Sequence, residues 1–304
     1  MTRTPTVYPG GMKIWGIDWS GAKAAGKKVW IADATCRKGQ LTINTVVQAA
    51  SKEGIGAKTA DEVLDKLVAT LSGPDAPDWV GIDCAFSLPQ ETMKRLKPDT
   101  WEGLIAAVGP DYETPTELRN ACREDLKEGA KEEKRDIDIA ALTAWSPYNL
   151  RMVAQTFHGM RLLHRLREGR VASILPFDAV SNEKPNVLEI CPGTSLEAAG
   201  LSGIRYKAGS RKTNPGRHRA REIVMGRISK VWDVHISADL YQLAVNDTEG
   251  DAVDAILAAI STAFDAALKT PEWHAQTRAK TSEMKLRGEG WVYSDPWDPT
   301  RTAS

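Results

Sequence analysis

Two apolar segments that end on the same tripeptide, Gly-Ile-Asp, constrain the fold of this chain most strongly. The first is "KIWGIDWS" at 13–20 and the second is "DWVGIDCAF" at 78–86. Nearly continuous apolar residues are typical of a β-strand that is covered on both faces. Ending such a strand on an unpaired carboxylate is costly, because the charge loses hydration. The repetition therefore indicates a shared purpose for Asp18 and Asp83.

The segments around these strands predict a mixed sheet. Strands expected at 27–35 and 40–47 follow the first Gly-Ile-Asp strand, and the short links between them favour antiparallel pairing. The apolar spacing at 58–73 predicts a helix with Thr59 as its N-cap. A strand, a crossover helix and another strand favour parallel pairing, so the second Gly-Ile-Asp strand is expected to lie parallel to an earlier one.

The rest of the chain alternates between helical and strand patterns. Residues 99–170 are expected to be mostly helical, and their charged run at 117–138 is typical of a solvated helix face. A fifth strand that leads into a short helix is predicted within 186–200. Amphipathic helices are predicted at 214–232, with basic character, and at 250–268, where the pattern is strongest.

These elements predict an α/β fold with a mixed five-stranded sheet, three antiparallel strands followed by parallel strands, flanked by helices. We expect a single domain at 13–295 with a helical insertion at about 99–170. A disordered N-terminal lead is expected at 1–12, and a C-terminal tail at 296–304.

Composition excludes several classes of protein. Forty basic and forty acidic residues give no net charge, which argues against a non-specific nucleic-acid binder with a basic excess. The sequence has no window near the ~18 uncharged apolar residues of a membrane span. Its four cysteines form no CxxC pair, which argues against a zinc site or a disulfide framework and predicts a reducing, cytoplasmic location.

Carboxylates recur at predicted strand ends and helix starts: Asp18, Asp83, Glu189, Asp251 and Asp254. If the two Gly-Ile-Asp strands are parallel neighbours, Asp18 and Asp83 lie side by side at one sheet edge, where ligand sites of α/β sheets gather. Two carboxylates about 4 Å apart repel by roughly 4 kcal/mol at an effective dielectric constant of 20. Such a pair shares a proton or holds a cation, and oxygen ligands favour Mg²⁺ or Mn²⁺.

Each acid also has a purely structural interpretation. Asp18 and Asp83 could cap turns, Glu189 could be a surface or ion-paired residue, and Asp251 lies where a helix N-cap belongs. Asp254 lies one turn further on, on the same helix face as Asp251. Four alanines would let this helix lie close to a sheet: Ala252, Ala255, Ala258 and Ala259. The cation site is inferred from the acids together.

The order of the motifs resembles a known family. The segments "GIDWSG", "GIDCAFSLP", "LEICPGTSL", "YKAG…R", "GDAVDAILAA" and "EGWVY" resemble the uncharacterised family numbered 429 among domains of unknown function, regarded as predicted ribonuclease H-like nucleases. The resemblance extends from about Lys13 to Tyr293. The spacing Asp251-x-x-Asp254-Ala is similar to the last helix of RuvC-type Holliday-junction resolvases.

This resemblance implies a ribonuclease H-like fold and a nuclease. By position it implies Asp18, Asp83, Asp254 and Glu189 as catalytic acids, with Asp251 as a further metal ligand. Carboxylates around paired Mg²⁺ or Mn²⁺ ions can support hydrolysis of a phosphodiester. The implied partner is nucleic acid, with RNA and DNA both open.

Basic side chains offer phosphate contacts. The densest basic segment, 205–222, carries Lys207, Arg211 and Arg217 as candidate contacts. Its further cations are Lys212, Arg219 and Arg221. An exposed basic helix that offsets the acidic insertion is the alternative. Ten tryptophans offer stacking surfaces for unpaired bases, although those in the predicted strands are expected in the core.

Two other functions stay open. Ser20 and Lys23 in "WSGAK" distantly resemble the phosphate loop of actin-like ATPases and sugar kinases, so a phosphotransferase or ATPase is the first alternative. A ribonuclease H-fold scaffold without catalytic activity is the second. The sequence contains no GxxxxGK[ST] loop, HExxH motif or GxSxG elbow.

Overall fold

The computed structural model describes residues 11–98, 100–124, 126–127, 129–269, 271–283 and 288–293. The first ten residues of the predicted lead and the whole of the predicted tail at 296–304 lie outside the described residues. The lead predicted through residue 12 ends earlier, because the first strand begins at Met12.

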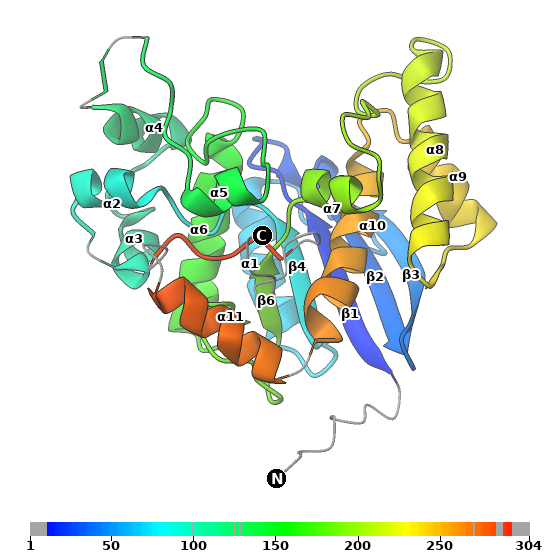
Figure 1. The fold of residues 1–304 in the computed structure, drawn as a ribbon, viewed down its shortest axis with the longest axis horizontal. Coiled ribbons are helices and arrows are strands. Elements are labelled where there is room, and N and C mark those ends of the chain that lie inside the picture. Colours follow the sequence, from blue (N-terminus) through cyan, green and yellow to red (C-terminus); the bar gives the residue numbers. More distant parts are fainter. Residues whose placement is uncertain are drawn as a thin grey trace, which may run out of the picture.

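A mixed sheet in the order β5-β6-β4-β1-β2-β3-β7 runs through the centre of the structure (Figure 1). Its strands are β1 (Met12–Asp18), β2 (Trp30–Arg37), β3 (Gln40–Gln48), β4 (Trp79–Asp83), β5 (Ser173–Ile174), β6 (Asn186–Glu189) and β7 (Val234–His235). β1, β2 and β3 pair antiparallel, whereas β4 lies parallel to β1 and β6 lies parallel to β4. The predicted α/β class and mixed sheet are confirmed.

The predicted number of five strands is wrong, because the sheet of the described residues has seven. The five predicted strands form its centre, and β5 and β7 extend its two edges in parallel to β6 and β3. Each added strand has only two residues. A segment this short shows no alternation of apolar and polar residues, so periodicity could not reveal it.

Helices cover both faces of the sheet (Figure 1). They are α1 (Ala60–Leu71), α2 (Gln90–Leu96), α3 (Trp101–Ala107), α4 (Pro115–Arg123), α5 (Asp136–Ala140), α6 (Val153–Glu168), α7 (Pro192–Ala198), α8 (Pro215–Val231), α9 (Ala238–Asn246), α10 (Asp251–Ser261) and α11 (Pro271–Glu283). A 3₁₀ turn, η1 (Ala25–Lys27), and a π-helical turn, η2 (Thr262–Ala267), complete the elements. In the part of the chain described, no helix is both long and apolar enough to cross a bilayer.

The apolar core has two halves, one on each side of the sheet. α8, α9 and α10 build the first half against one face, and α1, α3 and α6 build the second against the other. Alternate residues of β1 point to opposite faces. Ile14 therefore belongs to the α10 side and Ile17 to the α1 side. Asp18 shares a face with Ile14 and so faces α10.

The two glycines of the Gly-Ile-Asp strands let α10 lie directly on the sheet. A Cβ atom on Gly16 would come within 2.1 Å of the Ala259 nitrogen and 2.3 Å of the Ala255 oxygen. A Cβ on Gly81 would come within 1.9 Å of Thr262 Oγ1. Since real Cβ contacts are not this short, only glycine permits this packing. The predicted close approach of the alanine-rich helix is confirmed.

Residues 99–170 contain the helices α3 to α6, which make up about half of the range, so the expectation of a mostly helical segment is confirmed only in part. The interpretation of the charged run at 117–138 as one solvated helix face is wrong. α4 ends at Arg123 and α5 begins only at Asp136. Arg135 and Asp138 are buried. Six charged residues of the run form ion pairs instead: Arg119 and Arg123 with Glu132, Glu133 with Arg95 of α2, and Arg135 with both Asp138 and Glu189 of the sheet.

Candidate metal centre

Asp18 and Asp83 are the last residues of two neighbouring parallel strands. They are direct partners in the register of β1 and β4, as Gly16 and Gly81 are two residues earlier. Equal register in parallel strands brings equivalent side chains to the same face and the same edge of the sheet. The predicted side-by-side placement of the two acids is confirmed.

Asp254 joins this pair from the first turn of α10. Carboxylate oxygens of Asp18, Asp83 and Asp254 lie within 4.8 Å of one another, close enough to share one ion. Asp18 is 5% exposed and Asp254 is 1% exposed, while Asp83 is partly exposed. The glycines beneath α10 make this approach possible, because a wider spacing between helix and sheet would move Asp254 away from the strand ends.

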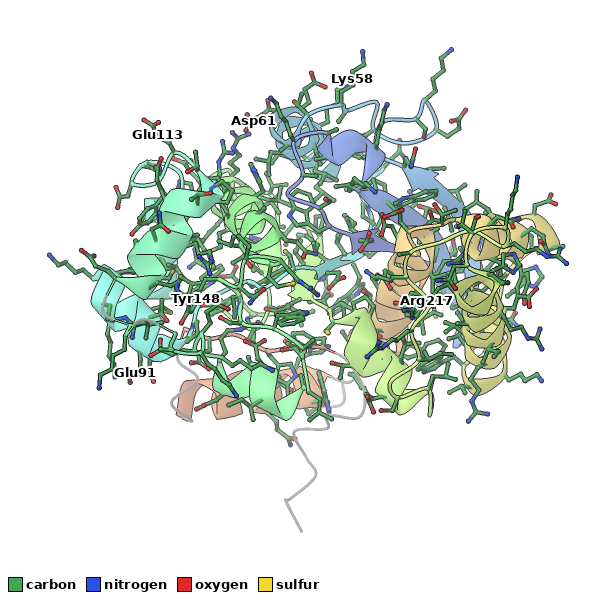
Figure 2. The ribbon with its side chains drawn as sticks, turned by 90° about the horizontal axis from the view of Figure 1, so that it is seen from above. Lys58, Asp61, Glu91, Glu113, Tyr148 and Arg217 are labelled. Carbon is green, nitrogen blue, oxygen red and sulfur yellow. The ribbon has the colours of Figure 1, made fainter. Side chains whose placement is uncertain are left out.

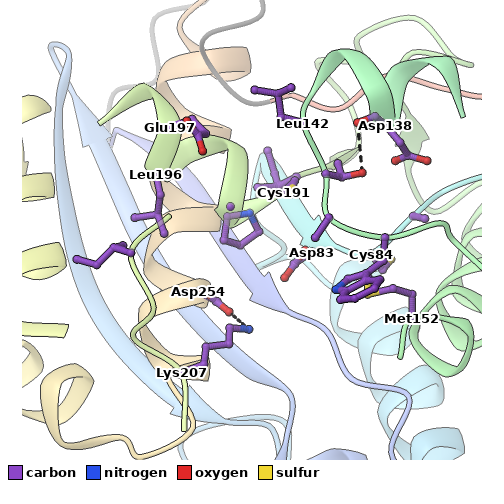
Figure 3. Close-up of a pocket in the computed structure, with 18 of the residues that line it drawn as sticks. Asp83, Cys84, Asp138, Leu142, Met152, Cys191, Leu196, Glu197, Lys207 and Asp254 are labelled. Carbon is purple, nitrogen blue, oxygen red and sulfur yellow. Dashed lines mark hydrogen bonds and ion pairs between the residues drawn. The ribbon is translucent and has the colours of Figure 1, made fainter. Parts of the chain in front are cut away.

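The loop before α8 supplies partners for both oxygens of Asp254. The Tyr206 hydroxyl donates a hydrogen bond to Oδ1. The Lys207 ammonium forms an ion pair with Oδ2, as Figure 3 shows. These donors fix the orientation of the carboxylate. Tyr206 is buried, whereas about half of the Lys207 side chain is exposed.

Asp18 and Asp83 have no comparable partners. Within the described part of the chain, neither carboxylate receives a side-chain or backbone hydrogen bond or forms an ion pair. Burial raises the pKa of Asp18 well above its usual range, and the neighbouring Asp254 and Asp83 charges raise it further, against the opposing effect of Lys207. Burial and the Asp254 charge likewise raise the pKa of Asp83 to about 7. The carboxylates of Asp18 and Asp83 therefore lack a counter-charge that would balance their own negative charges.

This donor set fits a divalent cation. A buried carboxylate normally has a donor or a counter-charge, and a cation would supply that charge to Asp18 and Asp83. Three carboxylates offer only oxygen ligands, which suit Mg²⁺ or Mn²⁺ better than softer metals. The nearby Lys207 ammonium shows that the cluster already attracts one positive charge. The expectation of a magnesium or manganese site is thus compatible with the residues present.

Asp251 lies beside the cluster. It was expected as the N-cap of the helix, but Gly250 takes that position with a φ of +85° and Asp251 is the first helical residue. The free amide of Ala252 is instead capped by the Asp247 carboxylate, at 2.9 Å. Burial raises the pKa of Asp251 to about 6. The three-carboxylate cluster does not include it, so its role as a metal ligand stays a prediction.

Glu189 reaches the same edge of the sheet at the end of β6 but has a different partner. Its carboxylate accepts two hydrogen bonds from Arg135, one of 2.8 Å from Nη1, and a third of 2.9 Å from the Phe86 amide. Arg135 is itself buried and also pairs with Asp138 of α5. The residue expected as a fourth catalytic acid therefore connects the insertion to the sheet, outside the three-carboxylate cluster.

A cavity of about 560 Å³ opens beside the cluster (Figure 3). Asp83 and Asp254 belong to its lining, as does Glu189. One wall comes from α5 and the loop that follows it. Another comes from α7 and the segment before α8, as Leu142, Leu196 and Lys207 in Figure 3 illustrate. Asp83 and Asp254 therefore border a space that a ligand could occupy, whereas Asp18 lies behind them, outside the lining.

The predicted phosphate contacts divide into two groups. Lys207 and Arg217 line the cavity, and Arg205 joins them. Arg211 is exposed and lies outside the lining. Arg221, a further cation of this segment, cannot reach a phosphate in the cavity, because it is fully buried and donates to the carbonyls of Val245, Tyr206 and Gly209. It thereby holds the segment that carries Tyr206 and Lys207.

Ser20 and Lys23 do not belong to the cavity. Both follow β1 in the turn that leads into η1, where Ser20 Oγ accepts a 3.3 Å hydrogen bond from the Ala22 amide. Lys23 is exposed, and neither residue is part of the cavity lining. The phosphotransferase alternative therefore gains no support from the residues that suggested it.

Sequence reasoning missed two residues of the site, Arg135 and Tyr206. Arg135 stands in a run of alternating charges, where nothing distinguishes one buried arginine from its exposed neighbours. Tyr206 is adjacent to Lys207 in "RYKAG". The tyrosine belongs to the "YKAG" motif of the family resemblance, but the motif assigns it no role, and only the packing of that loop on α10 reveals its contact with Asp254.

The comparisons with known proteins found no relative: no protein-family model, no curated protein and no solved structure matches this chain.

Proposed function

We propose that the chain is a divalent-metal-dependent nuclease with a ribonuclease H-like fold, in which Asp18, Asp83 and Asp254 hold Mg²⁺ or Mn²⁺. The observation that carries this proposal is the convergence of these three carboxylates from two parallel strands and one helix, within 4.8 Å of one another. Three antiparallel strands followed by parallel ones are compatible with this fold. The fold assignment itself belongs to the proposal.

The proposed reaction is hydrolysis of a phosphodiester. A water oxygen forms a bond to phosphorus, the ester P–O bond breaks, and the products are a phosphate monoester and an alcohol. One proton leaves the attacking water and one is taken up by the departing oxygen. A bound divalent cation would supply activation of the water and stabilisation of the negative charge that develops on phosphorus.

The chain's own residues have distinct roles in this proposal. Asp18 and Asp83, without donors of their own, present oxygens to the cation. Tyr206 and Lys207 hold the Asp254 carboxylate in its orientation. The exposed half of Lys207 lies in the cavity lining, where its ammonium can contact a phosphate oxygen while it remains near the cluster.

The cavity supports a polyanionic substrate despite the zero net charge of the chain. Arg205, Lys207 and Arg217 line it from one segment of the chain, around the acids. Cations in this position can neutralise phosphates that flank the reacting one. The scaffold alternative predicts the same cavity without turnover, so cleavage distinguishes the two.

A cleavage assay tests the proposal. Purified protein is incubated with labelled RNA, DNA, RNA–DNA hybrid and junction substrates in Mn²⁺, beside D83N and D254N. The matched control is E197Q, since Glu197 also lines the cavity but lies outside the cluster. We expect wild-type and E197Q proteins to cleave and both Asp variants to lose activity. Equal cleavage by D254N, or no cleavage of any substrate, would contradict the proposal.

A further inference from the structure

An exposed aromatic residue stands at the cavity that contains the carboxylates. Trp145 is 44% exposed and lines this cavity together with Leu142, which is 69% exposed. Both lie in residues 141–150, here called the platform loop, between α5 and α6. Large apolar side chains exposed beside a polar site typically mark a binding surface.

The platform loop is held firmly in place. The Thr143 amide donates a 2.9 Å hydrogen bond to the Asp138 carbonyl. The Thr143 carbonyl accepts a 2.6 Å hydrogen bond from Lys134 Nζ. Further on, Tyr148 is fully buried and its hydroxyl accepts a 2.7 Å hydrogen bond from the Glu133 amide. Figure 2 shows Tyr148 on the side of the insertion, across the molecule from Arg217. The exposure of the loop's apolar residues is therefore built into a fixed structure.

Two local features set the positions of the Leu142 and Trp145 side chains. Leu142 has a φ of +57°, a left-handed conformation that costs a non-glycine residue about 1–2 kcal/mol. The cost is retained although most of the Leu142 side chain gains no burial from it. The guanidinium of Arg151 lies 4.9 Å from the centre of the Trp145 ring, which steadies the indole through a cation–π contact.

The cavity thus combines three kinds of surface. The platform loop supplies an apolar and aromatic wall, Asp83 and Asp254 supply the acids, and the segment before α8 supplies cations such as Lys207. Its volume of about 560 Å³ is in the range of small-molecule sites and suits single nucleotides better than a stacked duplex. Aromatic stacking together with backbone cations is how proteins bind unpaired strands.

The geometry points to an unpaired nucleobase as the occupant of this wall: the base packs against Trp145 and Leu142, so that a neighbouring phosphate reaches the carboxylate cluster. This inference rests on the proposed nuclease function and names its substrate class, single-stranded nucleic acid or a strand with unpaired nucleotides. Fully paired duplex cannot place a base on the wall without unpairing it, at a cost of a few kcal/mol.

Equilibrium binding tests the inference. Fluorescence anisotropy of a short labelled single-stranded oligonucleotide, and of the same strand in a duplex, is measured with Ca²⁺ in place of Mn²⁺. W145A is expected to weaken single-strand binding by roughly 5- to 150-fold, the range for loss of one stacked base. W145F should retain most of the affinity. Duplex should bind more weakly than single strand and respond little to W145A.

Two leucines of the platform loop provide a matched control. Leu142 lines the cavity, whereas Leu150, 73% exposed, does not. L142A should weaken single-strand binding and L150A should leave it unchanged. Unaltered affinity in W145A, or equal losses in L142A and L150A, would overturn the inference. Thermal melting of each variant verifies that it is folded.

The two proposals fail differently. If D254N abolishes cleavage while W145A binds the single strand normally, the nuclease proposal stands and the inference about the base is rejected. If W145A loses single-strand affinity and wild-type protein cleaves nothing, the nuclease proposal fails and the wall is confirmed as a base-binding surface.

Discussion

Asp18 and Asp83 are register partners at the carboxyl ends of two parallel strands, and each follows a glycine on the same face two residues earlier. Because these glycines have no side chain, α10 packs directly on the sheet, and this packing places Asp254 beside the two acids. The repeated tripeptide thus combines a packing function and a chemical one. The aspartates supply the oxygens, and the glycines set the distance at which the third carboxylate arrives.

The packing function predicts that G16A is destabilising. The added methyl group would overlap the backbone of α10 at Ala255 and Ala259, which forces the helix outward. Overpacking of this kind typically costs about 1–3 kcal/mol, measured as the free energy of unfolding in urea. Gly226 provides the control, because a Cβ there meets nothing within 4 Å in the middle of α8. G226A should be neutral or stabilising by up to about 1 kcal/mol. Equal effects of the two substitutions would argue against the packing account.

The Arg135–Glu189 contact predicts a loss of stability in E189Q. Removing one partner of a buried ion pair leaves the other charge uncompensated, which typically costs about 3–5 kcal/mol. Urea unfolding measures this cost, with E183Q as a control because Glu183 is exposed. The change for E183Q should stay within about 0.5 kcal/mol. An E189Q protein with unchanged stability and no cleavage would instead support the catalytic role suggested by the sequence resemblance.

The raised pKa of Asp83 predicts how stability depends on pH in the metal-free protein. With a pKa of about 7 in the folded state and 3.8 as the ordinary value, folded protein retains a proton between these values that unfolded protein has released. This contribution is complete below about pH 4 and is lost as pH rises through 7, so unfolding free energy declines across that window. Urea unfolding of wild type and D83N at several pH values measures it. A slope equal in both proteins would contradict this assignment.

The same pKa shifts predict proton release on metal binding. Because Mn²⁺ binds the ionised carboxylates, its affinity should rise between pH 6 and 8, by up to about tenfold per pH unit for each proton displaced. Calorimetric titrations in two buffers of different ionisation enthalpy measure the number of protons released. Affinity that does not change with pH would show that the cation binds elsewhere.

The pairing of Asp18 with Asp83 was predictable, because two strands with the same ending in parallel register must bring their ends together. The proximity of Asp254 to this pair was predictable from its position on an alanine-rich helix. The partners of these acids were not predictable. Arg135 and Tyr206 lie in charged or irregular segments whose local pattern does not reveal which side chain is buried. The edge strands β5 and β7 could not be predicted for a related reason. Each has only two residues and is recognised as a strand only by its pairing with a neighbour in the sheet.

The most direct test of the account is the location of Mn²⁺ in crystals of the protein. Anomalous diffraction near the manganese absorption edge should give a peak in contact with Asp18, Asp83 and Asp254 in wild-type crystals. The peak should be lost or strongly reduced in D254N. A wild-type structure grown in saturating Mn²⁺ with no anomalous peak at these three carboxylates would contradict the proposed metal centre and favour a scaffold without catalytic activity.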